Sequence, residues 1–240
     1  VARLTMPGRS ETHAGIGGNA LRASVLGAND GLVSNLSLVM GVAGARLDDS
    51  TILITGLAGL LAGACSMAMG EWISVQSARE LYTRELAVER WEIAERPEQE
   101  HEELVTLYTR RGLAPTAAEE LADVLMADPE QALEVMAREE LGIDPRDLGG
   151  SAWIAAGSSF ALFVAGAAIP VIPFALLAGT AAVVASLSAS ALALFAVGAT
   201  ITRITRRSPW RSGLRQLVIG LAAAVVTYLV GVGLGVSVRG

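Results

Sequence analysis

Six side chains in the middle of the sequence have types and spacings that could bind a divalent metal ion. They are Glu89, Glu92, Glu100, Glu103, Met136 and Glu140. The first four form two pairs at i and i+3, separated by Pro97, and the last two stand at i and i+4, so on helices each pair shares a face. If the chain folds back at Pro97, the carboxylates face one another, and their repulsion favours a cation among them.

The types of these side chains limit which metal ions could bind, but they also fit an acidic surface without metal. Carboxylate oxygens suit hard or borderline divalent ions, and a thioether shifts the preference toward a transition metal such as Fe²⁺. Acidic helices are nevertheless often simply solvated surfaces. Several arginines could neutralise these glutamates, namely Arg84, Arg90, Arg96, Arg110 and Arg111. A metal site and a solvated acidic face are therefore both compatible with the pattern.

Glu98 and His101 form a Glu-x-x-His spacing within the same region. This spacing is an element of di-iron helical bundles, which need two copies of it. The sequence has one copy, so we interpret His101 as a surface residue. A membrane-anchored di-iron oxidase, one alternative function, lacks its second histidine motif here.

A second kind of candidate is an ionisable group inside an apolar segment. Asp30 lies in ANDGLVSNLSLVMG, and inserting a charge at such a position costs at least about 2.5 kcal/mol. That cost makes a functional role the default interpretation. The structural alternatives are that Asp30 caps a helix break at Gly31 or bonds to Asn35.

The stretch SMAMGEW ends a second apolar segment and adds two more candidates. Met67 and Glu71 are one helical turn apart and share a face, whereas Met69 points elsewhere. We interpret Met67 with Glu71 as the better pair of candidate ligands and predict that Met69 packs. The alternatives are that Met67 is core filler and that Glu71 reaches interfacial water.

Long apolar segments must position these residues. The sequence is 52% hydrophobic and 18% charged with a net charge of −6, and its mean hydropathy is +0.49. Of the 24 acidic residues, 17 fall between Glu80 and Glu140, so charge is segregated from the apolar segments. Continuous apolar runs of this length predict an all-α integral membrane protein rather than a barrel. The five predicted transmembrane helices are 23–45, 51–77, 150–169, 173–201 and 214–236.

The predicted domain order follows from the same segregation. A cytosolic N-terminal segment covers 1–22, helices one and two cover 23–78, a glutamate-rich insert covers 79–148, and helices three to five cover 149–240. In the insert, residues 80–95 continue the second span until Pro97. Further helices are expected at 98–111, 116–126 and 129–141, with a capping box from Thr116 to Glu119.

The arginines predict how the chain is oriented in the membrane. The sequence has 18 arginines and no lysine. The link RITRRSPWRSGLR holds Arg203, Arg206, Arg207, Arg211 and Arg215, whereas the expected turn IPVIP carries no charge. Arginine-rich short loops stay cytoplasmic. Five spans then place the N-terminal segment, with Arg3, Arg9 and Arg22, and the insert in the cytoplasm. No cleaved signal peptide is expected.

Several functions have no residues to carry them. The sequence shows no nucleophile elbow, phosphate-binding loop or HExxH motif, so we expect no enzyme activity. No basic, aromatic-interleaved patch indicates nucleic acid. The lone Cys65 predicts no disulfide within the chain.

These segments together resemble the vacuolar iron transporter family of divalent-metal transporters. The resemblance rests on NDGLVSNLSLVMGVAGA, GLAGLLAGACSMAMGEWISVQS, the acidic insert and the IPVIPF turn, and it covers essentially the whole chain. It implies five transmembrane helices per subunit, a homodimer with its pathway at the subunit interface, and exchange of Fe²⁺ or Mn²⁺ against protons.

The resemblance also assigns residues. The family's Glu-x2-Glu-x7-Glu-x2-Glu spacing falls on Glu89, Glu92, Glu100 and Glu103, its later positions fall on Met136 and Glu140, and its pathway aspartate and methionine fall on Asp30 and Met67. One departure is Val135-Met136, where the family often has paired methionines. The metal is a substrate, and no prosthetic group is implied.

The expected partners and membrane complete the prediction. Metal ions, protons, the lipid bilayer and a second copy of the chain are the expected partners. The short, lysine-free, alanine-rich chain predicts a bacterial plasma membrane, or a vacuolar membrane if the chain is eukaryotic. A metal sensor without transport is the other alternative, although it would leave Asp30 unexplained.

Overall fold

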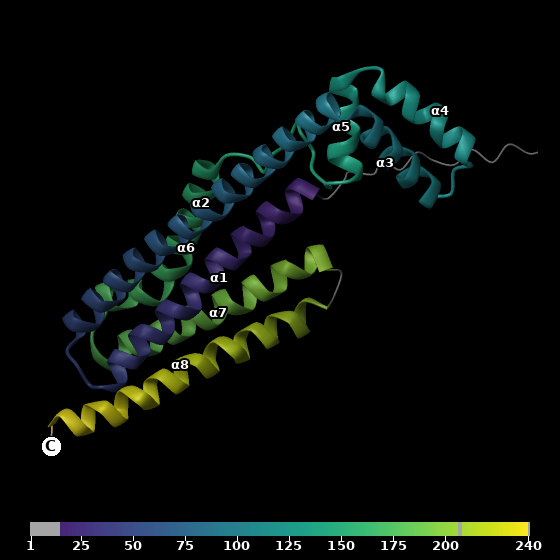
Figure 1. Cartoon of the computed structure of the whole chain (residues 1–240). Coiled ribbons are helices and arrows are strands. Elements are labelled where there is room, and N and C mark those ends of the chain that lie inside the picture. The colour runs from purple at the N-terminus through teal and green to yellow at the C-terminus, as the bar shows by residue number, and fades with distance from the viewer. Residues whose placement is uncertain (1–14, 206–207, 240) are drawn as a thin grey trace, which may run out of the picture. The chain divides into compact units, whose positions relative to one another are not determined.

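The fold is all-helical throughout the part of the chain that the structure, a computed structural model, describes: residues 15–205 and 208–239 (Figure 1). Within these ranges there are eight helices and no strands. The helices are α1 (Gly15–Gly44), α2 (Asp49–Glu95), α3 (Pro97–Arg110), α4 (Pro115–Met126), α5 (Pro129–Glu139), α6 (Ala152–Leu176), α7 (Gly179–Thr205) and α8 (Pro209–Arg239). The predicted fold class is therefore confirmed at the level of an all-α protein.

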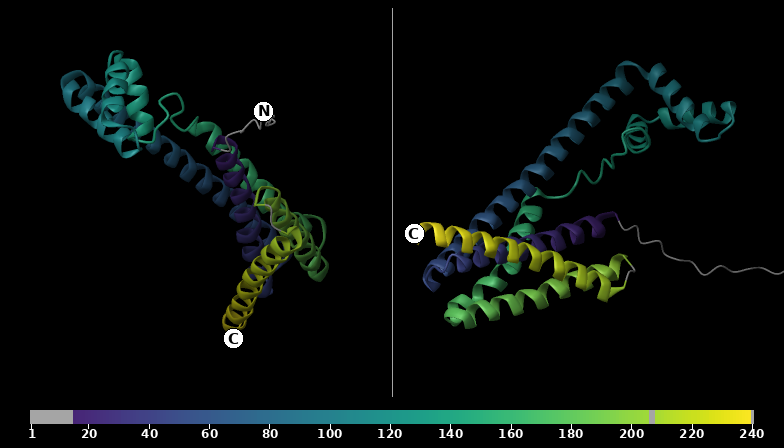
Figure 2. Two further views of the ribbon diagram at one scale, coloured as in Figure 1. Left: turned by 90° about the vertical axis from the view of Figure 1, so that its right-hand side faces the viewer. Right: turned by 90° about the horizontal axis from the view of Figure 1, so that it is seen from below.

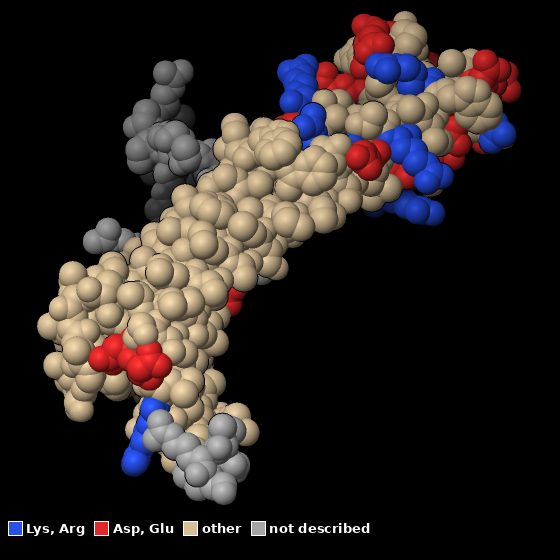
Figure 3. Space-filling view, turned by 90° about the vertical axis from the view of Figure 1, so that its left-hand side faces the viewer, with Lys and Arg blue, Asp and Glu red and all other residues tan. Residues whose placement is uncertain are grey.

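The chain divides into two compact units. One, here called the insert, is Glu71–Trp153, and the other, here called the membrane unit, comprises the segments up to Gly70 and from Ile154 onward. Charged side chains gather over the insert, whereas the visible face of the membrane unit is almost uncharged (Figure 3).

Four helices are long and apolar enough to cross a membrane: α2, α6, α7 over Gly179–Thr200, and α8 over Pro209–Gly235. Over its described residues α1 falls short of that standard. Asn29, Asp30 and Asn35 lower its hydropathy, although the helix is 30 residues long. The chain is thus a membrane protein, and composition alone gives four spans rather than the predicted five.

In the membrane unit, α1, α7 and α8 run side by side (Figures 1 and 2). Two glycines permit close approach to α1, because small residues let membrane helices pack tightly. A Cβ at Gly31 would overlap the carbonyl oxygen of Phe163 in α6, and one at Gly231 would overlap that of Gly41. The core beside them is formed by α1 residues such as Leu32, Leu36 and Met40 with α6 and α7.

The predicted turn at IPVIP is wrong, because α6 continues through Pro170 and Pro173 to Leu176. Proline removes a backbone donor and leaves the carbonyl four residues earlier without its helical bond, which membrane helices tolerate. The Ser186 hydroxyl of α7 donates to the Pro170 carbonyl at 2.7 Å and so joins α7 to this part of α6. The helix then ends normally, with the Leu177 amide donating to the Pro173 carbonyl.

Other predicted helix limits also shift. The first helix begins at Gly15 rather than at residue 23, and the last begins at Pro209 rather than at 214. Pro209 suits a first helical position because its missing N–H would be unpaired there anyway. Arg203 and Arg211 therefore lie in helices, while Arg3, Arg9, Arg206 and Arg207 lie outside the described residues.

The insert begins on an unbroken α2, as predicted, and turns at Arg96-Pro97. The chain leaves α3 at Gly112, whose φ of +100° favours glycine. The short helices then bury a core that includes Ile93, Leu104, Leu125 and Met136. This core packs the acidic helices together.

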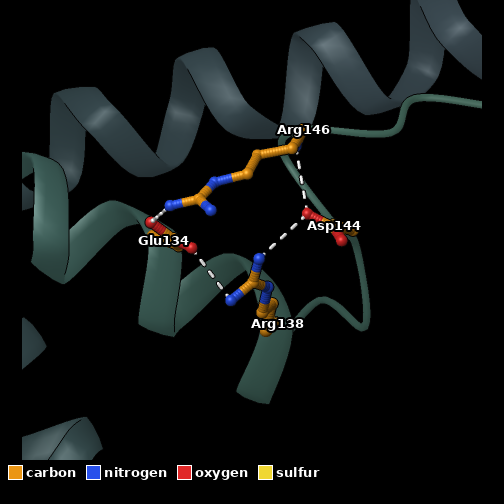
Figure 4. A network of polar contacts seen from close by, with 4 residues as sticks. All are labelled: Glu134, Arg138, Asp144 and Arg146. Atoms are coloured by element: carbon orange, nitrogen blue, oxygen red, sulfur yellow. Dashed lines mark hydrogen bonds and ion pairs between the residues drawn. The ribbon is translucent and has the colours of Figure 1, made fainter.

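The ends of α4 and α5 differ from each other. The predicted capping box at Thr116 is wrong, because α4 starts at Pro115 after Ala114, which provides no side-chain cap. In contrast, Asp128 caps α5 by accepting from the Glu130 amide at 3.0 Å. Within α5, Arg138 contacts Glu134 at 2.9 Å, and Arg146, which follows the helix, contacts the same glutamate at 2.8 Å; both arginines also bond to Asp144 (Figure 4).

Candidate metal centre and translocation residues

Three glutamates from three parts of the insert converge at one point. Carboxylate oxygens of Glu89, Glu100 and Glu140 all lie within 4.8 Å of one another. Glu89 lies on α2, Glu100 lies on α3, and Glu140 directly follows the end of α5. Glu89 and Glu100 are only 4% and 5% exposed. We call Glu89, Glu100 and Glu140 the carboxylate cluster.

Burial and mutual repulsion make this cluster costly to ionise. Burial first, and then the charges of Glu140 and Glu100, raise the pKa of Glu89 from 4.5 to about 8. Burial and the charge of Glu103 raise the pKa of Glu100 to about 7. The pKa of Glu140 also rises, through burial and its acidic neighbours. Glu89 Oε1 is buried without a hydrogen-bond partner, so the cluster has the donor set and the unmet demand that a cation would satisfy.

The other three predicted ligands border the cluster. Glu92 and Glu103 are close enough for their charges to raise the pKa of Glu89. Met136 is 1% exposed and belongs to the hydrophobic core of the insert. Together with Glu103 and Glu140 it also lines an open cavity of about 820 Å³ between α3 and α5. All six residues are thus brought to one region of the insert.

The arginines of the solvated-face alternative make their contacts elsewhere. Arg90 pairs with Glu130 at 3.4 Å, and Arg111 pairs with Glu139. Arg96 lies 5.1 Å from the ring centre of Trp91. Among the ion pairs of the described residues, none includes a member of the carboxylate cluster. Arginine therefore does not neutralise the buried carboxylates.

In the membrane unit, Asp30 lies within an unbroken α1 and is exposed. Among the described residues, Asp30 neither caps a helix break at Gly31, because α1 is continuous there, nor bonds to Asn35. The Asn35 side chain donates to backbone carbonyls of α2 and α6 instead. Ser34, one turn after Asp30, and Ser37, two turns after it, are also at least partly exposed. We call these three residues the polar stripe of α1.

Met67 lies beside the same helix, whereas Met69, which was predicted to pack, is exposed within this chain. The Met67 sulfur would be 3.7 Å from a Cβ at Gly27, three residues before Asp30. Met67 is half-buried against a small hydrophobic core formed by Leu60, Ala64, Phe163 and Ala167. Met69, in contrast, is 63% exposed. Glu71 follows one turn later in α2 and is half-buried in the insert.

Comparison with known proteins decides the family. The sequence profile of the VIT family matches residues 21–232. The chain belongs to the VIT family. Its relatives include a protein named "Vacuolar iron transporter" from Acanthamoeba castellanii, 45% identical over 153 residues, which are 63% of this chain and 54% of that protein. The chain therefore spans about half the length of the amoebal relative.

Two plant relatives match over greater shares of both chains. "Vacuolar iron transporter 1" of Arabidopsis thaliana is 32% identical, covering 88% of this chain and 84% of the relative. "Vacuolar iron transporter 2" of Oryza sativa subsp. japonica is 30% identical, covering 94% and 92%. These relatives are eukaryotic, so they give the predicted bacterial origin no support.

Membership confirms two expectations about chemistry. VIT family members are transporters and not enzymes. Metal is accordingly a transported species in the family and not a cofactor. The resemblance stated from the sequence motifs is confirmed, while the exchange reaction and the individual ligands stay predictions.

Two polar contacts in this VIT-family chain were not anticipated from its sequence. His101 Nε2 lies 2.8 Å from Asp123 Oδ1, and the His101 side chain is 28% exposed, so it is less exposed than a surface residue was expected to be. Asn35 donates to the Gly56 carbonyl at 3.1 Å and to the Ala167 carbonyl at 2.8 Å, which joins α1 to α2 and α6. A polar residue within an apolar segment was the only available signal for Asn35.

Proposed function

We propose that this chain transports Fe²⁺, and also Mn²⁺, out of the cytosol in exchange for protons. The observation that carries the proposal is the carboxylate cluster, with three carboxylates within 4.8 Å and a buried oxygen that lacks a partner. Its setting in a membrane protein supports transport, as do the amoebal and plant relatives, which are named as iron transporters.

In this proposal the insert captures the metal. Glu89, Glu100 and Glu140 bind it directly, because a divalent cation offsets the repulsion that raises their pKa values. Glu92 and Glu103 add negative charge around the ion and complete its coordination. The Met136 thioether favours a transition metal over Mg²⁺.

Asp30 and Met67 form the translocation site, and Glu71, the first residue of the insert, stays a predicted pathway residue. The Met67 sulfur lies next to Gly27, one turn before Asp30 in α1, so thioether and carboxylate donors border the same stretch of helix. A carboxylate cannot hold a proton and a metal ion at the same lone pair. Protonation from the acidic side of the membrane would therefore release the metal, which couples the two fluxes.

The proposed assembly is a homodimer with five transmembrane helices per subunit, and with its N-terminal segment and insert in the cytoplasm. The polar stripe supports the dimer, because polar side chains in membrane helices generally face protein or a water-filled cavity rather than lipid. The name "Vacuolar iron transporter" favours a vacuolar or other organellar membrane.

Transport is tested in proteoliposomes that contain a metal indicator and a pH indicator. We expect Fe²⁺ uptake with opposite proton flux, and loss of both with Asp30→Asn, which preserves side-chain shape and removes the charge. Cys65→Ser, an exposed position on α2, serves as the control and should transport normally. Uptake without proton flux, or full uptake by Asp30→Asn, contradicts the exchange mechanism.

Metal capture is tested separately by calorimetric titration of the full-length protein in detergent with Mn²⁺. Glu89→Gln with Glu100→Gln should weaken binding at least tenfold, about 1.4 kcal/mol. The matched control is Glu119→Gln with Glu120→Gln, which removes two exposed charges from α4. If both double variants bind Mn²⁺ with the same affinity, the carboxylate cluster is a solvated acidic face and not a metal site. Binding without any transport would instead indicate a metal sensor.

A further inference from the structure

A pocket at the start of α8 is lined by arginine and serine side chains. It has a volume of about 430 Å³, and its described lining residues are Ser208, Arg211, Ser212 and Arg215. All four side chains can donate hydrogen bonds, and none of them is a carboxylate. The pocket therefore suits an anion. None of its residues belongs to the carboxylate cluster or to the predicted translocation pathway.

The two arginines of the pocket keep their charge available. Arg211 and Arg215 are exposed and stand one turn apart on α8, so they share a face. Among the ion pairs of the described residues, none includes either of them. Arg111 and Arg138 of the insert, in contrast, each pair with a glutamate. Two neighbouring positive charges repel each other, and an anion between them would offset this repulsion.

A buried hydroxyl in the same pocket lacks a partner. Ser212 is only 8% exposed, and its backbone amide donates to the Ser208 carbonyl at 3.2 Å. Its hydroxyl lines the pocket and makes no hydrogen bond with the residues that the structure describes. Buried polar groups are normally hydrogen-bonded. The Ser212 hydroxyl is therefore an unmet donor for whatever occupies the pocket.

The pocket also lies at the end of a membrane helix. α8 is 31 residues long, is apolar enough to cross a membrane, and its positive N-terminal end attracts phosphate groups. Trp210 packs against Phe195 of α7, with ring centres 5.2 Å apart, and is still 75% exposed. Exposed tryptophans collect at the membrane–water interface. We therefore expect the pocket at the depth of the lipid headgroups.

We propose that Ser208, Arg211, Ser212 and Arg215 bind the phosphate group of an anionic phospholipid. Guanidinium groups match phosphate oxygens with two parallel hydrogen bonds, and the serine hydroxyls donate to the remaining oxygens. The excess positive charge favours a headgroup with a net negative charge. The acyl chains would lie along the exposed apolar side chains that follow on α8, such as Leu214 and Val218. The proposal does not depend on transport.

Native mass spectrometry of the full-length protein in detergent tests this site, with phosphatidylglycerol as the probe. Arg211→Gln with Arg215→Gln should lower the affinity for phosphatidylglycerol at least tenfold. The matched control is Arg79→Gln with Arg84→Gln, which removes two exposed charges from α2 and should bind like the parent protein. Equal losses in both double variants would show a general effect of net charge and overturn the site. Equal affinity of the parent protein for phosphatidylcholine would also overturn it.

Ser212→Ala tests the pocket without a change of charge. It should lower the affinity for phosphatidylglycerol about threefold, the effect of one hydrogen bond, whereas Ser77→Ala, an exposed position on α2, should not. If the arginine variant fails to fold by circular dichroism, an unchanged affinity of Ser212→Ala overturns the proposal.

Inorganic phosphate is the second probe, because a free phosphate would use the same donors. Its ³¹P resonance is measured with the parent protein and with Arg211→Gln, Arg215→Gln. If the parent protein broadens this resonance, the arginine variant does not, and both bind phosphatidylglycerol equally, the pocket takes free phosphate. That result would overturn the assignment to a lipid.

Discussion

Glu89 shows how a single buried side chain connects folding with metal capture. It lies on the long helix α2, whose other glutamates are exposed or half-buried, yet it is 4% exposed and has an unpaired carboxylate oxygen. An ionised carboxylate in such a place destabilises the fold unless a cation joins it. Metal binding and proton release at Glu89 are therefore linked.

This linkage predicts how pH affects the metal-free protein. The pKa of Glu89 is raised from 4.5 to about 8, so between these values the folded state binds the extra proton. As far as Glu89 is concerned, the free energy of unfolding of the insert is then highest below about pH 4.5, falls as pH rises from 4.5 to 8, and levels off above 8. Hydrogen exchange of amides in α3 and α5, corrected for its intrinsic base catalysis, should accelerate over this window, and Mn²⁺ should reverse the acceleration.

Glu89→Gln is the variant that isolates this effect. Without the ionisable group, the rise in exchange rate between pH 6 and 9 should be much smaller than in the parent protein, and Mn²⁺ should protect less. Glu119→Gln, an exposed position on α4, should retain the pH dependence of the parent. The same pH dependence in Glu89→Gln would show that other groups cause it.

At the scale of helices, the contact between α6 and α7 depends on one of two equally buried serines. Ser186 and Ser190 are one turn apart on α7 and are both 0% exposed. Ser186 donates to the Pro170 carbonyl, whereas the Ser190 hydroxyl has no partner among the described residues. The hydroxyl of Ser186 therefore stabilises the proline-containing helix, and that of Ser190 does not.

Substitution of each serine tests this difference. Ser186→Ala should lower the free energy of unfolding by about 1 kcal/mol, because it leaves a buried carbonyl with one bond fewer. Ser190→Ala should be neutral or slightly stabilising, since it removes an unsatisfied hydroxyl. Thermal unfolding in detergent gives the comparison. Equal effects of the two substitutions would mean that volume, not hydrogen bonding, matters at these positions.

At the scale of the whole molecule, the polar stripe of α1 needs a neighbour that a single chain does not supply. Asp30, Ser34 and Ser37 are at least partly exposed on a helix packed within the membrane unit. In the proposed homodimer this stripe faces its symmetry mate across the pathway. Metal and protons would then pass between two copies of the same residues.

Cross-linking through this stripe tests the dimer. In a Cys65→Ser background, Ser34→Cys should form a disulfide-linked dimer in native membranes under mild oxidation. Val225→Cys is the control, because this α8 side chain is 56% exposed and apolar, as expected for a lipid-facing position. Cross-linking at position 225 but not at 34 would place the interface on another face.

The sequence by itself determined the helical class, the acidic insert and the candidate ligand residues. The length of an apolar segment and the separation of charged from apolar segments can be read directly along the chain. It also predicted the turn at Pro97 and the continuity of α2. The prediction was wrong at IPVIP, where α6 continues through both prolines, and at Thr116, where a proline one residue earlier begins α4. Only the tertiary structure decided which glutamates meet. Burial, the unpaired oxygen of Glu89 and the pairing of His101 with Asp123 depend on how separate helices pack, and residue spacing within one helix does not contain that information.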